Sequence, residues 1–386
     1  MKKLLRLIAL ATISVLVFAS CEGPMGHYGE RGERGERGER GERGERGEDG
    51  KDATCNRCHT PKSVAAITND YYYFSDHAIL PRGTVRSAAG CAACHSHQGF
   101  TFAVENDSYT GPPTTVVPAA RHTAFNCYTC HSEIHTEYDW RLTTTAPVKM
   151  DMWRDGTNYP KTADYTFGNS SSNLCLRCHQ PRAITGINNI LSNPSAPNTN
   201  FGTNPAYSAG IHYNTGQILA AGVGGIEFGS GYTNSAHVAM TSCATCHMPK
   251  RNNLPGFMGH RFNIKGNYDG CTSCHAGMTA TDPKNVDSKA AIEGLLTELA
   301  DKLKDVVGGG NHVVLPNGNL NVYHATNNPT GYWAGGSGPA FPALTNAQYG
   351  AIINYQLAAR SAGAKSGAHN FPYVKKLLEN SIAAID

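Results

Sequence analysis

The chain has 386 residues, of which 42 are glycine, 20 are proline and 13 are cysteine, and its formal net charge at pH 7 is +3. This length is enough for a sizeable domain or two, but the glycine and proline content predicts a loop-rich fold. So small a net charge argues against nucleic acid as a partner, because nucleic-acid-binding surfaces carry a clear basic excess.

The N-terminus has the pattern of a secretory signal. Lys2, Lys3 and Arg6 precede an apolar run over 7–18, which is too short and wrongly flanked for a membrane-spanning helix. Phe18-Ala19-Ser20-Cys21 resembles a bacterial lipobox, although the family usually has Leu where Phe18 stands. The resemblance implies that residues 1–20 are removed and that Cys21 carries a lipid that attaches the protein to a membrane. The alternative is a secreted protein with one spare thiol.

Residues 21–52 form a second segment, in which glycine occupies every third position. Ten glycines run from Gly23 to Gly50, and six consecutive triplets from Gly29 to Arg46 read Gly-Glu-Arg. Only glycine fits at the axis of a collagen triple helix, and the tract resembles bacterial collagen-like repeats. A triple helix would make the protein a homotrimer. The alternative is a polyampholyte tether with no fixed structure, and in both cases the segment is a spacer.

The sequence Cys-x-x-Cys-His occurs six times and accounts for twelve of the thirteen cysteines. This spacing is typical of c-type haem attachment, in which two thiols bind the haem covalently and the histidine ligates its iron. A single copy would also suit a redox dithiol or half of a zinc site, but six copies in register favour six haems. The cysteines are Cys55 and Cys58, Cys91 and Cys94, Cys127 and Cys130, Cys175 and Cys178, Cys243 and Cys246, and Cys271 and Cys274, and the proximal ligands are His59, His95, His131, His179, His247 and His275.

Residues 53–282 are predicted to be a haem-binding region with little regular secondary structure. Between the motifs the chain is mostly Thr, Asn, Gly and Pro, and few regular elements are predicted before residue 283. The macrocycles would supply the apolar interior, so we predict a mainly helical and irregular, haem-cored fold. Removal of the three basic residues of the leader brings the polypeptide charge to zero (3 − 3), and the haem propionates would make the loaded protein mildly acidic.

Ten further histidines after the spacer are candidates for the sixth coordination site of the irons: His77, His97, His122, His135, His212, His237, His260, His312, His324 and His369. Six irons with two imidazoles each need six of them. A histidine a few residues from its own motif does not easily reach the opposite haem face, so His97 and His135 would serve a neighbouring haem.

Several of these histidines lie in segments that resemble multihaem cytochromes, including the ammonia-forming nitrite reductases and the surface cytochromes of respiring anaerobes. Cys243–Pro249 with the following Gly259-His260 resembles a Cys-x-x-Cys-His-Met-Pro element that precedes a ligating histidine, and Gly367–Asn370 resembles a Gly-x-His-Asn element, with Pro372 one position late. Ser75-Asp76-His77 and Ser235-Ala236-His237 share a Ser-x-His pattern upstream of a motif. The resemblance implies the distal ligands His77, His237, His260 and His369, to which we add His135 and His212.

Residues 283–386 are more regular and are predicted to pack on the haem region. Helical spacing is found over 292–306, 349–357 and 374–382. Residues 313–323 read as a hairpin around Asn317-Gly318, which would bring His312 and His324 close together. Asn370 is predicted to cap the last helix, with Pro372 in its first turn.

These features predict an exported, lipid-anchored hexahaem cytochrome c that carries electrons through closely spaced bis-His haems at the outer membrane, the cell surface or in the periplasm. Its partners would be other redox proteins or extracellular electron acceptors. The alternative is an enzyme, a multihaem reductase of nitrite, hydroxylamine or a related small oxyanion with one open haem site. The nitrite reductases usually mark that haem with Cys-x-x-Cys-Lys, which this chain lacks, so an electron carrier with no catalytic residue is the prediction.

Overall fold

The structure is a computed structural model of the chain. It describes residues 64–78, 87–134, 140–165, 171–184, 186–198, 211–212, 215–249, 259–264, 268–279, 284–305, 310–314, 320–324 and 344–386. The chain divides into two units, Met1–Asp52 and Ala53–Asp386. The predicted signal, Cys21 and the glycine-repeat segment belong to the first unit and lie outside the described residues, so the fold below is that of the second unit.

The first part of this unit is helical, with elements that the sequence pattern did not reveal. It contains α3 (Val64–Phe74), the 3-10 turn η1 (Asp76–Ala78), α4 (Ala89–His95), α5 (His97–Glu105), η3 (Ala119–Arg121) and α6 (Cys127–Cys130). Ser96 separates α4 from α5, and its side chain caps α5 by accepting a hydrogen bond from the Gly99 amide at 3.0 Å. The prediction of few regular elements before residue 283 was therefore wrong for α3 and α5, which lie between the motifs.

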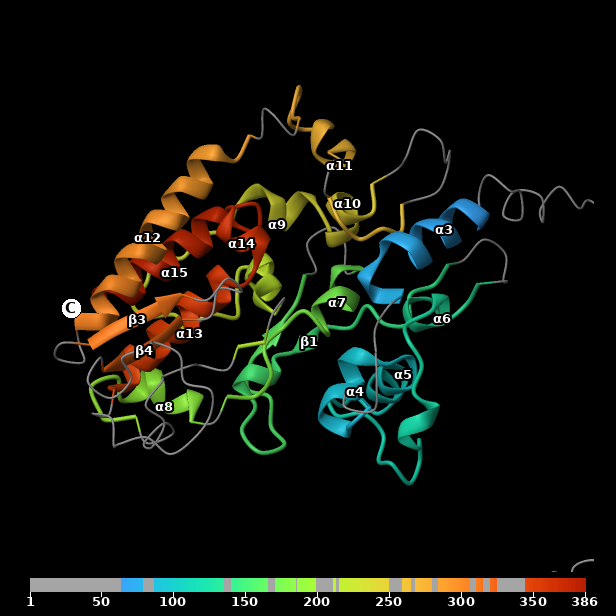
Figure 1. Cartoon of the computed structure of the whole chain (residues 1–386), viewed down its shortest axis with the longest axis horizontal. Helices are drawn as coiled ribbons and strands as arrows, with labels where there is room; N and C mark the ends of the chain where they lie inside the picture. Colours follow the sequence, from blue (N-terminus) through green and yellow to red (C-terminus); the bar gives the residue numbers. More distant parts are fainter. Residues whose placement is uncertain are drawn as a thin grey trace, which may run out of the picture. The chain divides into compact units, whose positions relative to one another are not determined.

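The middle of the chain has shorter elements joined by loops. They are β1 (Val148–Lys149), η4 (Asp151–Trp153), β2 (Thr162–Ala163), α7 (Ser171–Leu176), α8 (Ile187–Ser192), η6 (Gly216–Ala221), α9 (Ala236–Met240), α10 (Cys243–His247) and α11 (Asp269–Thr272). Strands β1 and β2 pair antiparallel, with Val148 opposite Ala163. Figure 1 shows α9, α10 and α11 following one another along one side of the unit.

The three predicted C-terminal helices are confirmed, with longer bounds. They are α12 (Val286–Asp305), α13 (Asn346–Ala359) and α15 (Phe371–Ala383), with the short α14 (Ala362–Lys365) between the last two. Strands β3 (Gly310–Val314) and β4 (Leu320–His324) form the predicted antiparallel hairpin. The backbone register places His312 opposite Val322 and His324 opposite Gly310, so the two histidines are offset by two positions rather than directly paired.

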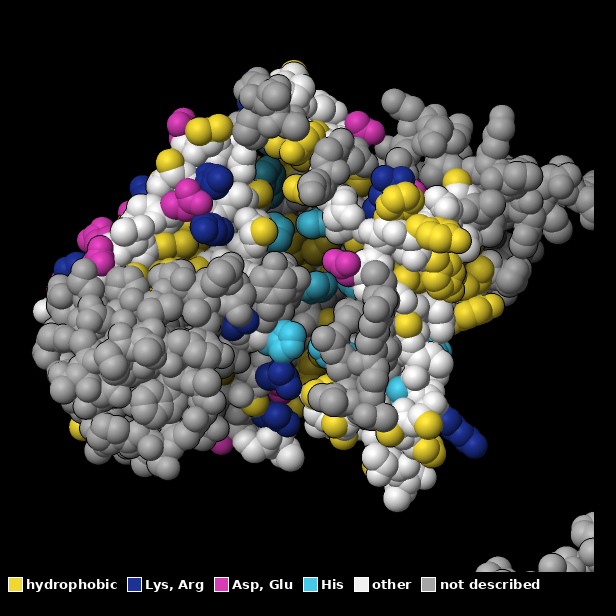
Figure 2. Space-filling view, viewed as in Figure 1, with side chains coloured by type: hydrophobic (Ala, Val, Ile, Leu, Met, Phe, Trp, Pro, Cys, Tyr) yellow, Lys and Arg dark blue, Asp and Glu magenta, His cyan; other side chains and the backbone are white. Residues whose placement is uncertain are grey.

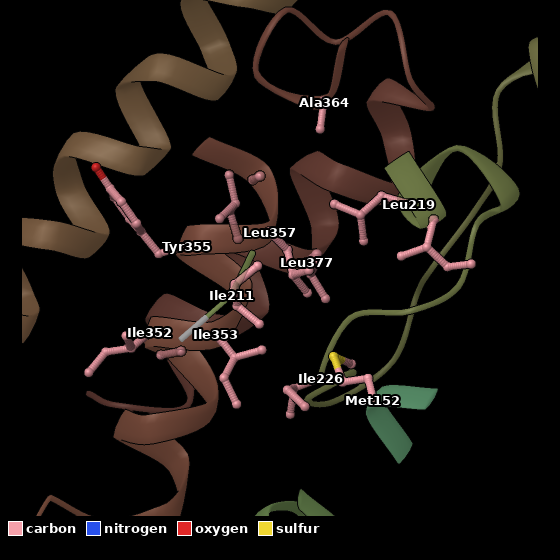
Figure 3. Packing of buried hydrophobic residues seen from close by; sticks show 14 of the residues in the cluster. Met152, Ile211, Leu219, Ile226, Ile352, Ile353, Tyr355, Leu357, Ala364 and Leu377 are labelled. Carbon is pink, nitrogen blue, oxygen red and sulfur yellow. The ribbon is translucent and has the colours of Figure 1, made fainter. Parts of the chain in front are cut away.

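A large apolar core surrounds α13, which is buried on nearly every side. Figure 3 shows Leu357 of α13 beside Leu377 of α15, and Ile353 on the side of α13 toward Ile226 from the middle of the chain, with Ile352 on the opposite side of the helix. The polar side chain of Asn354 is also fully buried, and it both accepts from the Ile226 amide and donates to the Ile226 carbonyl at 2.8 Å. Such double pairing satisfies a buried amide that would otherwise destabilise the core.

The N-terminal helices have a much smaller side-chain core. It contains only Tyr71, Phe100 and Phe125, with a few partly buried residues packed against them. The mostly helical character of the prediction is confirmed. The side-chain core is nevertheless larger than we predicted, because it draws in residues such as Val148, Met152 and Ile218 from the predicted haem-binding region.

One predicted detail of α15 was wrong. Asn370 stands at the first position of the helix but makes no capping hydrogen bond, and its backbone is left-handed with φ = 65°. Its amide side chain instead accepts from Ser235 N at 2.9 Å and donates to Asn234 Oδ1 at 2.8 Å. Asn370 therefore ties the start of α15 to the segment before α9. Within the described residues, no helix combines the length and the apolar character needed to cross a membrane.

Candidate functional site: paired histidines beside the Cys-x-x-Cys-His motifs

Each motif in the described part of the chain begins in a short helix: α4 and α10 contain a whole motif, α6 ends at the second cysteine, and α7 and α11 each end one residue after the first cysteine. In a helix, residues three and four positions apart lie on one face. The first cysteine, the second cysteine and the histidine of the motif are related by these spacings, so one helical turn presents two thiols and an imidazole to the same side. The first motif, with Cys55, Cys58 and His59, lies outside the described residues.

Two of these helices begin with reciprocal capping boxes. Asn126 and Thr129 exchange side-chain-to-backbone hydrogen bonds at the start of α6, and Ser242 and Thr245 do the same at the start of α10. The sequence analysis missed these residues, although the pattern of a polar cap followed by Thr three positions later was visible in it. The boxes fix the motif turn in both helices without using the cysteines.

Four ring contacts between described histidines each join a motif histidine to a histidine outside the motifs. The ring centroids are 6.0 Å apart for His77 and His179, 5.7 Å for His95 and His212, 5.8 Å for His237 and His275, and 6.1 Å for His247 and His369. The structure therefore brings together four of the six histidines predicted as distal ligands with four different motif histidines. The partners are 38 to 122 residues apart in the sequence, so the pairing is a property of the fold.

The spacing of these pairs fits axial ligation of one metal ion by two imidazoles. A metal–imidazole bond is about 2.0–2.1 Å long, so two rings bound from opposite sides have centres about 6 Å apart. The donor set also fits, because histidine nitrogen is a common axial ligand of haem iron. Among the described residues no group of three or more His, Cys, Asp or Glu surrounds a common point, so these are two-ligand arrangements. Figure 2 shows histidine side chains lining a hollow on one face of the molecule, around α7, α9 and α10 of Figure 1.

The pair His77 and His179 is held by aromatic side chains. The His77 ring stacks on Phe125 with centroids 6.1 Å apart and meets the edge of Phe262 at 4.8 Å. Burial, and then the nearby His179 and His247, lowers the pKa of His77 to about 4. The imidazole is therefore neutral at ordinary pH, which is the form that ligates a metal.

The pair His247 and His369 lies where α10 meets the segment before α15. A Cβ atom at Gly363 would come within 2.2 to 2.4 Å of the His369 ring atoms, so the absence of a side chain at Gly363 makes room for that ring. Burial, followed by the neighbouring histidines with His247 first, lowers the pKa of His369 to about 4. His247 Nδ1 lies 3.0 Å from the Phe262 carbonyl oxygen.

Two other histidines of the site also place Nδ1 within hydrogen-bond distance of a backbone carbonyl oxygen. Nδ1 of His131 lies 2.9 Å from the Trp140 carbonyl oxygen, and Nδ1 of His237 lies 3.3 Å from the Ala368 carbonyl oxygen. A carbonyl only accepts, so each of these nitrogens carries the proton and Nε2 has the free lone pair. Metal-ligating histidines almost always donate their second nitrogen in this way, which fixes the tautomer and the ring orientation.

The motifs themselves lie next to one another. Cys178 Sγ lies 3.9 Å from the carbonyl oxygen of Ala93, which is part of the α4 motif, and the Cys243 amide donates to the Ser172 hydroxyl of α7 at 3.1 Å. Burial is the main cause that raises the pKa of Cys246 to about 11, and Cys271 and Cys274 of the next motif contribute. Glycine is required at 270, because a Cβ there would come within 2.2 Å of the Thr245 carbonyl oxygen. The motifs of α4, α7, α10 and α11 thus form a continuous series.

The motif of α6 adjoins this series beside α7. Cys130 contributes to the raised pKa of both Cys175 and Cys178, so its thiol is close to the α7 motif. The α7 motif therefore has the motifs of α4, α6 and α10 around it, and it is the centre of the arrangement.

Arg177, inside the α7 motif, is a further residue that the sequence analysis did not single out. Its side chain is buried, donates through Nη2 to the Ala103 carbonyl at 2.7 Å and the Ser108 carbonyl at 3.1 Å, and lies over the Tyr109 ring. These bonds join the α7 motif to the end of α5. The burial of a single arginine cannot be predicted from one sequence when its neighbours form no apolar periodic pattern.

The remaining predicted ligands are placed as follows. His260 contacts the Phe262 ring, with centroids 5.9 Å apart. His135 lies outside the described residues. His131 contacts the Trp140 ring at 5.7 Å, and no histidine among the described residues is in ring contact with it.

Comparison with known proteins adds no further information about this site. No family model, curated protein or solved structure matched the chain. The functional conclusion depends on the residues and the geometry given above.

Proposed function

We propose that this chain is an exported hexahaem c-type cytochrome that carries electrons. The observation that carries the proposal is that four histidines outside the motifs each meet the histidine of a different motif, at ring separations of 5.7 to 6.1 Å. If histidines packed at random, there would be no reason for every contact to join a motif histidine to a histidine outside the motifs. When bound, the haems would supply one-electron redox chemistry.

The residues of the chain have three roles in this proposal. The paired cysteines of each motif would hold a haem covalently, and the paired imidazoles would ligate its iron. The carbonyl groups of Trp140, Phe262 and Ala368 fix the tautomer of their histidines. The adjacency of the motifs around α7 supports the proposal, because a chain of carriers requires haem sites that lie side by side.

Haem content is the first test. Purified full-length protein should contain six haems per chain by pyridine haemochrome assay and by intact mass. The absorption spectrum should be low-spin in both oxidation states, because two imidazoles are strong axial ligands. Four or fewer haems per chain would refute the proposal.

Electron transfer is favoured over reduction of a small substrate because two imidazoles leave an iron with no open position. Carbon monoxide added to the reduced protein should therefore bind in well under one equivalent per chain. One full equivalent, together with a high-spin ferric signal in the resting protein, would favour a reductase of nitrite, hydroxylamine or a related oxyanion.

The location of the protein is part of the proposal. A signal over residues 1–20 and a lipid on Cys21 would anchor it in the outer membrane, and residues 21–52 would act as a spacer toward redox partners or extracellular acceptors. A Cys21→Ala variant should leave the membrane fraction. If that variant stays with the membrane in high salt, another anchor is present.

A further inference from the structure

One ring nitrogen of His122, which lies between η3 and α6, has a hydrogen-bond partner. Its Nδ1 lies 2.7 Å from the Ser96 hydroxyl oxygen. Ser96 is buried, donates its only hydroxyl proton to the Ala92 carbonyl at 3.1 Å, and accepts from the Gly99 amide at 3.0 Å. A serine hydroxyl has one proton and two lone pairs, so the remaining lone pair accepts from His122 Nδ1. The proton of the neutral ring is therefore on Nδ1.

The other ring nitrogen, Nε2, is buried and has no hydrogen-bond partner in the part of the chain that the structure describes. With Nδ1 protonated, Nε2 carries a bare lone pair. A buried acceptor without a donor costs free energy, and each such group in a protein needs an explanation. A lone pair of this kind is what a metal ion requires of an imidazole.

The same tautomer is found at two of the paired histidines. His237 and His247 use Nδ1 on a backbone carbonyl and are each in ring contact with a second histidine. His237 also shows that a histidine just upstream of one motif can face another, because it precedes the α10 motif but contacts His275 of the α11 motif. His122 is similarly placed, five residues before Cys127.

We propose that His122 Nε2 is an axial iron ligand at a haem that none of the four histidine pairs accounts for. This inference rests on the proposed function. The α6 motif is the described candidate, because no described histidine is in ring contact with His131. His122 thereby joins His135 and His260 as candidates for the irons outside the four pairs. It was among the ten histidines of the sequence analysis but not among the six selected there.

The test is His122→Ala in the full-length, haem-loaded protein. One of the six irons should become high-spin, giving one high-spin ferric signal per chain by electron paramagnetic resonance, and the reduced variant should bind one equivalent of carbon monoxide. Added imidazole should return that iron to the low-spin state, because it replaces the missing ring. Gln98→Ala is the matched control: its side chain accepts from the amide of Thr123, the residue after His122, at 2.8 Å, and its loss should leave all six irons low-spin because it removes no imidazole.

A second variant covers the case in which His122→Ala does not mature. His122→Met keeps a side chain of similar length and offers sulfur in place of nitrogen, so it should raise one midpoint potential and leave five unchanged. Six low-spin irons that bind no carbon monoxide in His122→Ala, or six unchanged potentials in His122→Met, would overturn the inference. Four or fewer haems per chain in the wild-type protein would refute the proposed function instead.

The iron can then be identified by removing one attachment site. In a His122→Ala background, Cys127→Ala with Cys130→Ala deletes the haem of the α6 motif. Loss of the high-spin signal would assign His122 to that haem, and its persistence would assign His122 to a haem of another motif. Both results support His122 as an iron ligand.

Discussion

The C-terminal helices and the N-terminal helices of the second unit are built in different ways. Around α13 the interior is filled by side chains such as Ile352, Leu357 and Leu377, all fully buried. The region from α3 to α6 has a cluster of three buried aromatic residues and carries the motifs of Cys91 and Cys127. Under the proposed function, the second region would depend on its haems for an apolar interior, whereas the first would not.

The largest expected effect comes from removing all the haems. If the twelve motif cysteines are replaced by alanine, the N-terminal helices should lose protection from amide hydrogen exchange, while α12, α13 and α15 keep theirs. The reason is that only the C-terminal region buries enough side-chain surface to fold alone. Hydrogen exchange read by mass spectrometry measures both regions at once. Equal loss of protection in both regions would contradict the proposal that only the N-terminal helices depend on haem for their interior.

Truncation inside the C-terminal core should be costly. Leu377→Ala removes a fully buried side chain that lies closely against the backbone at Gly225, and we expect a loss of about 2–5 kcal/mol in the free energy of unfolding. Leu191→Ala in α8 is the control, because Leu191 is 38% exposed and should change stability by about 0.5 kcal/mol or less. Denaturant melts followed by circular dichroism compare the two, and equal effects would show that α15 is not part of the core.

Gly363→Ala tests the place where the C-terminal helices meet the α10 motif. The added methyl group would overlap the His369 ring, and overpacking of this kind typically costs about 1–3 kcal/mol. We expect a high-spin signal from one haem as well as lower stability. Gly294→Ala in α12 meets nothing within 4 Å and should stabilise its helix by about 1 kcal/mol. An unchanged low-spin spectrum in Gly363→Ala would show that His369 is not an iron ligand.

The smallest effect is expected from a capping box. Thr245→Val removes the side chain that bonds the Ser242 amide at the start of α10, and loss of one such interaction costs about 1 kcal/mol. The spectrum should stay low-spin, because His247 keeps its Phe262 acceptor. Thermal melts of the haem-loaded protein measure the change, with Thr297→Val on the exposed face of α12 as control. A larger change than that of Gly363→Ala would mean that the box also positions the imidazole.

Local parts of this structure could be predicted from the sequence, because they depend on short-range spacing. The motif turns follow from the three- and four-residue spacing of thiols and imidazole, and Ile292, Leu299 and Leu303 are buried in α12 as their period indicates. Strands β3 and β4 also have the expected pairing.

Which histidine meets which motif could not be predicted, because the pairs are set by tertiary structure. His95 and His212 are separated by 117 residues, and nothing local to either specifies the other. His122 lacks the sequence pattern that singled out His77 and His237, and its bare Nε2 becomes visible only when Ser96 is seen to hold Nδ1. Asn370 was misassigned as a cap for a similar reason, since its partners Ser235 and Asn234 lie far away in the chain.

The central claim is that the four histidine pairs are axial ligand pairs of haem irons. Anomalous diffraction from crystals of the haem-loaded protein at the iron absorption edge locates the irons independently of any assumption about their ligands. The account predicts an iron between the two rings of His77 and His179, of His95 and His212, of His237 and His275, and of His247 and His369. Irons located away from these ring pairs, or ligated on the distal side by other residues, would contradict it.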